Sequence, residues 1–135
     1  MATAFSLESF TRQAPLKRAK AIENGLPARV LRDLVQDPAV TIAAVSRVVA
    51  PRRTLDRRLK ENSPLSLEES DRLSRFIDLL ALTTQVFGSR ADAMEWLSEP
   101  KDAFEGEIPL NLLRSDAGTR AVEEYLLRIR HGFFA

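Results

Sequence analysis

The sequence predicts an all-α protein, and two observations lead to this prediction. No stretch alternates apolar and polar residues over the length of a strand, no Asn-Gly hairpin occurs, and β-branched residues gather only in "VTIAAVSRVV". Instead, apolar residues recur three and four positions apart between turn residues. With 135 residues, 44% of them hydrophobic, the chain has the size of one domain.

The N-terminal half is expected to contain four helices. Proline in the first turn, with glycine or proline beyond the last turn, marks where a helix starts and stops. These signals predict a short basic helix from Pro15 to Glu23, an amphipathic helix between Pro27 and Pro38, and a helix opened by Pro51 that runs through Lys60. Between the last two, Thr41 is expected to cap a short helix, "IAAVSRVVA", with Ile42, Val45, Val48 and Val49 turned inward.

The C-terminal half is expected to begin with a long helix. Ser66 and Glu69 have the spacing of a capping box, and apolar residues then repeat at helical spacing toward Gly88. Ser89 with Asp92 gives a weaker cap for a short helix. After a turn-rich segment, a final amphipathic helix leads into the terminal sequence "RIRHGFFA".

Charge is distributed unevenly along the chain. Residues 1–62 contain 12 Lys/Arg and 6 Asp/Glu, whereas residues 63–135 contain 8 and 13. The formal net charge is only +1, so this asymmetry indicates two surfaces with different partners. The densest basic stretch is "PRRTLDRRLK", residues 51–60.

This basic stretch suits a helix that contacts DNA. Leu55 and Leu59 form its apolar edge, and three cations project about 140° to 200° from Leu55. Guanidinium groups bind phosphates and guanine edges, and the preceding short helix supplies the other half of a helix-turn-helix. The alternative is a solvated charged face, but no acidic residues intersperse on it. The predicted DNA-binding residues are Arg47, Arg52, Arg53, Thr54, Arg57, Arg58 and Lys60.

The same region resembles a known family. "TIAAVSRVVAPRRTLDRRLK" is similar to the helix-turn-helix of Xre-type antitoxins in the Xre/MbcA/ParS family, and "LSLEESDRLSRF" to the segment that follows it. "AMEWLSEP", "IPLNLLRSDAG" and "AVEEYLLRIRHGFFA" resemble the family's C-terminal toxin-binding domain, so the likeness runs from about Gly25 to Ala135. Val49 stands where such turns usually have glycine, and Pro51 where the recognition helix usually begins with Ser or Thr.

The resemblance implies an antitoxin with an N-terminal extension (1–24), a helix-turn-helix region (25–65) and a helical toxin-binding domain (66–135). It implies a RES-domain toxin that consumes NAD+ and whose active site is blocked by the C-terminal segment. It also implies repression of the protein's own operon, and a homodimer on a palindromic operator is the natural unit for such modules. The residues that the resemblance assigns to toxin contact are Arg128, Arg130, His131, Gly132, Phe133, Phe134 and Ala135.

Composition leaves little room for catalysis. His131 is the only histidine and cysteine is absent, so a Cys-His pair and a His/Cys zinc set are excluded. No glycine-rich phosphate loop occurs either. We expect no enzymatic activity, no cofactor, no metal site, no membrane span and a cytoplasmic protein.

Three alternatives stay open at this point. The terminal phenylalanines fold back onto the core in one of them, as aromatic side chains commonly do. In another, the protein is a helix-turn-helix transcription regulator that has no toxin partner. In the third, it is an interaction module that no longer binds DNA, for which Val49 and Pro51 are the reason.

Overall fold

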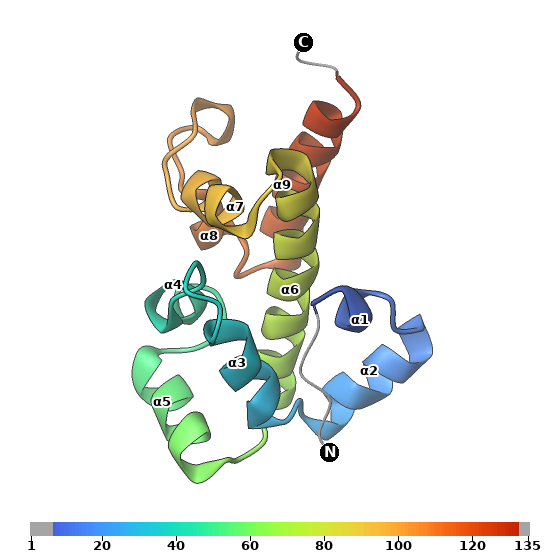
Figure 1. Ribbon diagram of the computed structural model, residues 1–135, viewed down its shortest axis with the longest axis vertical. Coiled ribbons are helices and arrows are strands. Elements are labelled where there is room, and N and C mark those ends of the chain that lie inside the picture. Colours follow the sequence, from blue (N-terminus) through green and yellow to red (C-terminus); the bar gives the residue numbers. More distant parts are fainter. Residues whose placement is uncertain (1–6, 133–135) are drawn as a thin grey trace.

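The computed structural model describes residues 7–132, and within this range every regular element is a helix, as the sequence predicts. The elements are α1 (Leu7–Thr11), α2 (Pro15–Asn24), α3 (Ala28–Val35), α4 (Ile42–Ser46), α5 (Arg52–Glu61), α6 (Leu67–Phe87), α7 (Arg90–Leu97), η1 (Asp102–Phe104), α8 (Pro109–Leu112) and α9 (Asp116–Arg130). Helix α6 runs along the centre of the molecule. Helices α3 to α5 lie beside its N-terminal half and α7 to α9 beside its C-terminal half (Figure 1).

Two helices, α1 and α2, precede Gly25, where the sequence predicts one. Both pack against α6, on the side away from α5 (Figure 1). Arg18 of α2 fixes this arrangement, because its guanidinium donates to the carbonyl oxygen of Ser74 at 3.1 Å and lies 2.8 Å from the Asp78 carboxylate. The same guanidinium covers the Phe10 ring at 4.5 Å from the centroid.

Helix α4 is shorter than its apolar pattern predicts. Thr41 caps it as expected, by accepting a hydrogen bond from the amide of Ala44 at 3.1 Å. It ends at Ser46, and the amides of Val48 and Val49 then bond back to the carbonyl oxygen of Val45 at 3.0 and 2.9 Å. These two valines are buried in the turn rather than on a helix stripe.

Helix α6 begins and ends as predicted. Ser66 accepts from the amide of Glu69 at 3.1 Å, and the Glu69 carboxylate accepts from the amide of Ser66 at 2.9 Å. Gly88 ends the helix in the left-handed conformation, with φ of 93°. The capping box fixes where α6 starts, directly after the helix-turn-helix region.

The C-terminal helices α7, α8 and α9 form a second layer on α6, called the C-terminal layer below. Ser89 and Ser115 cap α7 and α9 by accepting from the amides of Asp92 and Gly118. In the first turn of α9, a Cβ atom at Gly118 would collide with the carbonyl oxygen of Leu112. Glycine is therefore needed here so that the backbones of α8 and α9 can approach closely.

Within residues 7–132, one hydrophobic core joins the helix-turn-helix region to the C-terminal layer. It extends from Leu31 and Leu55 of the helix-turn-helix region, through Phe76 and Leu80 of α6, to Leu126 of α9. Burial of each such side chain stabilises the fold by about 1.5–3 kcal/mol. In the same part of the chain, none of the helices is long and apolar enough to span a bilayer.

Candidate nucleic-acid interface and C-terminal segment

Helix α5 is fixed by its apolar edge and exposes its cations. Leu55 is fully buried, and Arg32 of α3 donates to the carbonyl oxygen of Leu59 at 3.3 Å and to the side-chain oxygen of Asn62 at 3.4 Å. The three cations that project away from this edge are all exposed, and none forms an ion pair with any residue between 7 and 132: they are Arg53, Arg57 and Lys60.

The flanking residues of the predicted DNA site differ in their exposure and in the ion pairs that they form. Arg47 is exposed at the C-terminal end of α4, and Thr54 is half-buried. Arg52 lies 3.9 Å from Asp56 in an exposed pair, which contributes little. Arg58 is turned to α6, where its Nε and one Nη donate to the two carboxylate oxygens of Glu69 at 3.1 and 3.3 Å.

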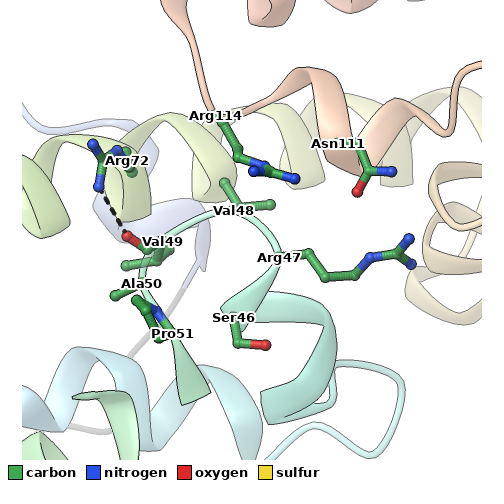
Figure 2. A pocket seen from close by; sticks show the side chains of 9 residues that line it. All are labelled: Ser46, Arg47, Val48, Val49, Ala50, Pro51, Arg72, Asn111 and Arg114. Atoms are coloured by element: carbon green, nitrogen blue, oxygen red, sulfur yellow. Dashed lines mark hydrogen bonds between the residues drawn. The ribbon is translucent and has the colours of Figure 1, made fainter. Parts of the chain in front are cut away.

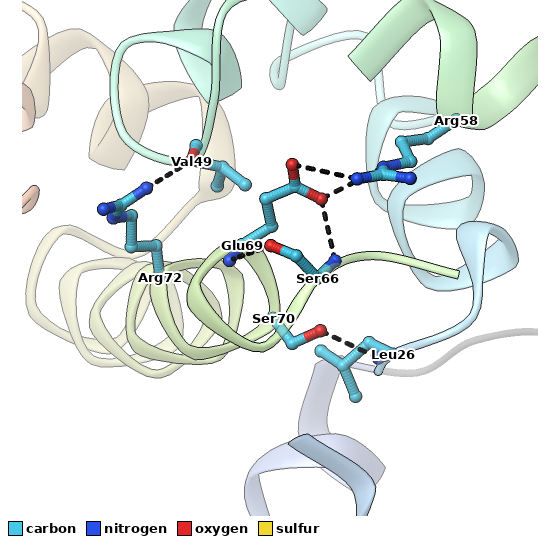
Figure 3. A network of polar contacts seen from close by, with 7 residues as sticks. All are labelled: Leu26, Val49, Arg58, Ser66, Glu69, Ser70 and Arg72. Atoms are coloured by element: carbon cyan, nitrogen blue, oxygen red, sulfur yellow. Dashed lines mark hydrogen bonds and ion pairs between the residues drawn. The ribbon is translucent and has the colours of Figure 1, made fainter. Parts of the chain in front are cut away.

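Figure 3 shows the polar network that joins α5 and the turn to the start of α6. Burial alone would raise the pKa of Glu69. The hydrogen bond from the amide of Ser66 and the adjacent Arg58 guanidinium outweigh this effect, so the pKa lies below its usual value. At the next residue, Ser70 accepts from the amide of Leu26 at 2.8 Å. The network fixes the recognition helix against α6.

Valine is accommodated in the turn without backbone strain. Among the described residues other than glycine, only Asn62 and Glu105 have positive φ, so Val49 does not need the conformation for which glycine is favoured. Its side chain is buried and its carbonyl oxygen accepts from Arg72 at 3.2 Å. Pro51 supplies no side-chain cap within the described chain, but its carbonyl oxygen accepts from the amides of Thr54 and Leu55.

A cleft of about 560 Å³ lies between this turn and the C-terminal layer. The turn residues Val48 to Pro51 line one wall, and Asn111 and Arg114 line the opposite one. In Figure 2, Arg47 and Arg114 extend from these two walls toward the side on which Asn111 lies. No local sequence pattern reveals this cleft, because Arg114 is far from residues 51–60 along the chain.

Helix α9 ends at the far end of the molecule from α5 (Figure 1). Of the residues assigned to toxin contact, Arg128 pairs with Glu124 at 2.8 Å, and Arg130 donates to the side-chain oxygen of Gln85 at 3.3 Å. His131 and Gly132 are exposed, and Gly132 has φ of 79°. The other three, Phe133, Phe134 and Ala135, lie outside the described residues.

Four half-buried aromatic rings gather where the end of α6 meets the C-terminal layer. Trp96 stacks on Tyr125 with centroids 6.2 Å apart, and Phe87 lies 5.4 Å from Trp96. The Phe104 ring lies edge-on to the rings of Trp96 and Tyr125. The Lys101 ammonium lies 5.1 Å from the centroid of the Trp96 ring. The cluster anchors α7 and η1 to α9.

The fold and its exposed cations define a helix-turn-helix protein with an appended helical domain. Residues 17–78 match the family described as the antitoxin Xre-like helix-turn-helix domain, and residues 82–132 match the antitoxin Xre/MbcA/ParS C-terminal toxin-binding domain. The chain belongs to the Xre/MbcA/ParS family of antitoxins. The expected division after residue 65 falls immediately before the cap of α6, whereas the helix-turn-helix match continues to residue 78, inside α6.

Relatives with established names support this assignment. Antitoxin Xre of Pseudomonas putida is 38% identical over 112 residues, which cover 83% of this chain and 70% of the relative. Antitoxin Xre of Yersinia enterocolitica is 30% identical over 63% of this chain and 58% of its own length. A Sphingobium protein named Prs ADP-ribosylating antitoxin is 29% identical over 97% of this chain and 89% of its own.

Proposed function

We propose that this antitoxin neutralises a RES-domain toxin that consumes NAD+, and that its C-terminal segment blocks the toxin's active site. The observation that carries the proposal is the match of residues 82–132 to a toxin-binding domain whose last helix ends in exposed residues. The name of the Sphingobium relative supports NAD+ chemistry, because ADP-ribosylation uses NAD+. The proposed contacts are Arg128, Arg130, His131, Gly132, Phe133, Phe134 and Ala135.

Occlusion by a short segment is physically reasonable. Aromatic side chains such as those of Phe133 and Phe134 fill apolar pockets of the kind that bind small molecules. The hydrogen bond from Arg130 to Gln85 joins the end of α9 to α6, and the ion pair of Arg128 with Glu124 lies within α9. The end of α9 at Arg130 therefore has a defined position on α6.

Removal of residues 132–135 tests this proposal. The truncated protein is expected to fold and to bind the purified toxin from the neighbouring gene, yet to leave its NAD+ consumption uninhibited. The matched variant is Phe133→Ala with Phe134→Ala, which removes the two aromatic rings and keeps the length of the chain. Full suppression of NAD+ consumption by the truncated protein would contradict occlusion by the segment.

We further propose that α5 enters the major groove of the operator and that a homodimer on a palindromic site represses the operon from the cytoplasm. Exposed, unpaired Arg53, Arg57 and Lys60 within the described chain support this proposal. Arg47, Arg52 and Thr54 flank them, and Arg58 contributes by holding α5 to Glu69.

Replacement of Arg53 and Arg57 by alanine tests the operator proposal. Each lost phosphate contact reduces affinity about fivefold at 0.15 M salt and lowers the log-log salt slope by about 0.9. The control, Lys17→Ala with Lys20→Ala, removes the same charge from α2, on the other side of α6 (Figure 1). Equal effects of the two double variants would argue against a groove-facing α5.

A further inference from the structure

The cleft between the turn and the C-terminal layer contains cations that the operator proposal leaves unused. Its lining includes Arg47, Arg72 and Arg114 but no carboxylate. None of the three arginines pairs with an acidic residue in the range 7–132, although Arg72 donates one hydrogen bond to the carbonyl oxygen of Val49. Three guanidinium groups thus share one cleft without a counter-charge.

The chemistry of the lining selects for a phosphate-like anion. Each guanidinium presents several N–H donors in a planar fork that fits phosphate oxygens, and the Asn111 amide adds another donor. Arg47 and Arg114 are exposed, and Figure 2 shows both extending toward the side of Asn111. Small-molecule sites are usually enclosed and mostly apolar, whereas this one is open with charged walls. An extended anion fits it better than a small ligand.

The position of the cleft indicates which extended anion this is. Pro51 lines the cleft and the next residue, Arg52, begins α5, so the cleft opens at the N-terminal end of the recognition helix. Recognition helices contact bases with their N-terminal residues, and the DNA backbone passes beside that end. A DNA strand that follows this path would pass Arg47 and then Arg114, which line the same cleft.

We propose that the cleft binds a backbone phosphate of the operator, and that Arg114 and Asn111 make this contact together with Arg47. The inference rests on the proposed operator binding and deepens it. Both new residues lie within 82–132, the part of the chain that matches the toxin-binding domain, and outside the helix-turn-helix match. The toxin-binding domain thereby takes a direct part in DNA binding.

The test is a salt titration of operator affinity for Arg114→Ala, alone and combined with Arg47→Ala. The probe is a duplex taken from directly upstream of the protein's own reading frame. Loss of one phosphate contact should weaken binding about fivefold at 0.15 M salt and reduce the slope of log affinity against log salt concentration by about 0.9. Loss of two contacts should weaken binding about 30-fold and reduce this slope by about 1.8. Arg114 is exposed and unpaired with residues 7–132, so thermal unfolding should not change.

The matched control is Arg120→Ala, which removes one exposed cation from α9, where it pairs with Asp116 at 2.9 Å. Arg114→Ala with unchanged affinity and slope overturns the cleft inference if Arg53→Ala with Arg57→Ala still weakens binding. Wild-type protein that fails to bind the duplex overturns the operator proposal and the cleft inference together. Loss of toxin affinity in Arg114→Ala, with DNA affinity intact, assigns the cleft to an acidic partner segment and also overturns the inference.

Discussion

Glu69 shows how much one side chain determines at the residue scale. Its carboxylate caps α6 through the amide of Ser66 and pairs with Arg58 of the recognition helix, while only 11% of the side chain is exposed. A nearly buried carboxylate that loses its partners has a desolvation cost with nothing to offset it. The residue therefore links the stability of α6 to the position of α5.

Glu69→Gln is expected to lower the free energy of unfolding at pH 7 by about 1–3 kcal/mol. Because the folded-state pKa of Glu69 lies below its unfolded value, this stabilisation is fully present above the unfolded pKa and is lost as pH falls through the folded pKa. Urea unfolding at pH 7 and pH 3 should show a larger difference in the free energy of unfolding between wild type and variant at pH 7 than at pH 3.

Glu68→Gln is the control for this measurement, because Glu68 is exposed and takes no part in the capping box. Similar losses of unfolding free energy for both variants at pH 7 would contradict the role given to Glu69.

The capping pair was predictable from sequence because it depends on residues three apart. The Arg58 partner was not, since it depends on how α5 packs against α6.

At the scale of elements, most helix limits followed from local signals, and those that did not were decided by packing. Caps at Thr41, Ser66 and Ser89 were predicted from sequence and are confirmed. Helix α4 ends early because Val48 and Val49 fill the core from a turn. The sequence pattern could not distinguish this burial from a helix stripe, because both use apolar residues at the same spacing.

Gly118→Ala tests the close contact between α8 and α9. Alanine is a better helix former than glycine by about 1 kcal/mol, so helix propensity alone predicts stabilisation. The added Cβ would collide with the Leu112 carbonyl oxygen, which belongs to the backbone and moves only if α8 moves. We expect a net loss of about 1–3 kcal/mol in the urea unfolding free energy.

Ala121→Gly provides the reference for this variant, because Ala121 is exposed on the same helix. It should cost about 1 kcal/mol, the usual penalty for glycine inside a helix. A gain in stability for Gly118→Ala would show that the two helices have room to separate, and the requirement for glycine would be withdrawn.

At the scale of the whole molecule, the DNA-binding and toxin-binding regions share α6 and one hydrophobic core within residues 7–132. The resemblance of the sequence motifs to the antitoxin family predicted both regions and their order. It did not predict the cleft or the polar network between them, since these need residues distant in the chain to meet. The shared core implies that the two regions unfold together rather than as independent domains.

Leu55→Ala tests this cooperativity from the helix-turn-helix side. Leu55 is fully buried, and its truncation should cost about 2–5 kcal/mol. Trp96 is the only tryptophan and lies in the C-terminal layer, so its fluorescence reports on the other region. In a urea titration, the fluorescence and far-ultraviolet circular dichroism midpoints should coincide in wild type and shift equally in the variant.

Leu126→Ala provides the reciprocal control, because it removes a buried leucine of α9 from the same core. Both variants should shift both signals, since a single cooperative unit loses stability as a whole wherever a buried contact is lost. A Trp96 midpoint that stays in place in Leu55→Ala, while the circular dichroism trace splits into two steps, would mean that the regions unfold separately. In that case α6 would act as a linker between two domains, and the polar network around Glu69 would stabilise only the recognition helix.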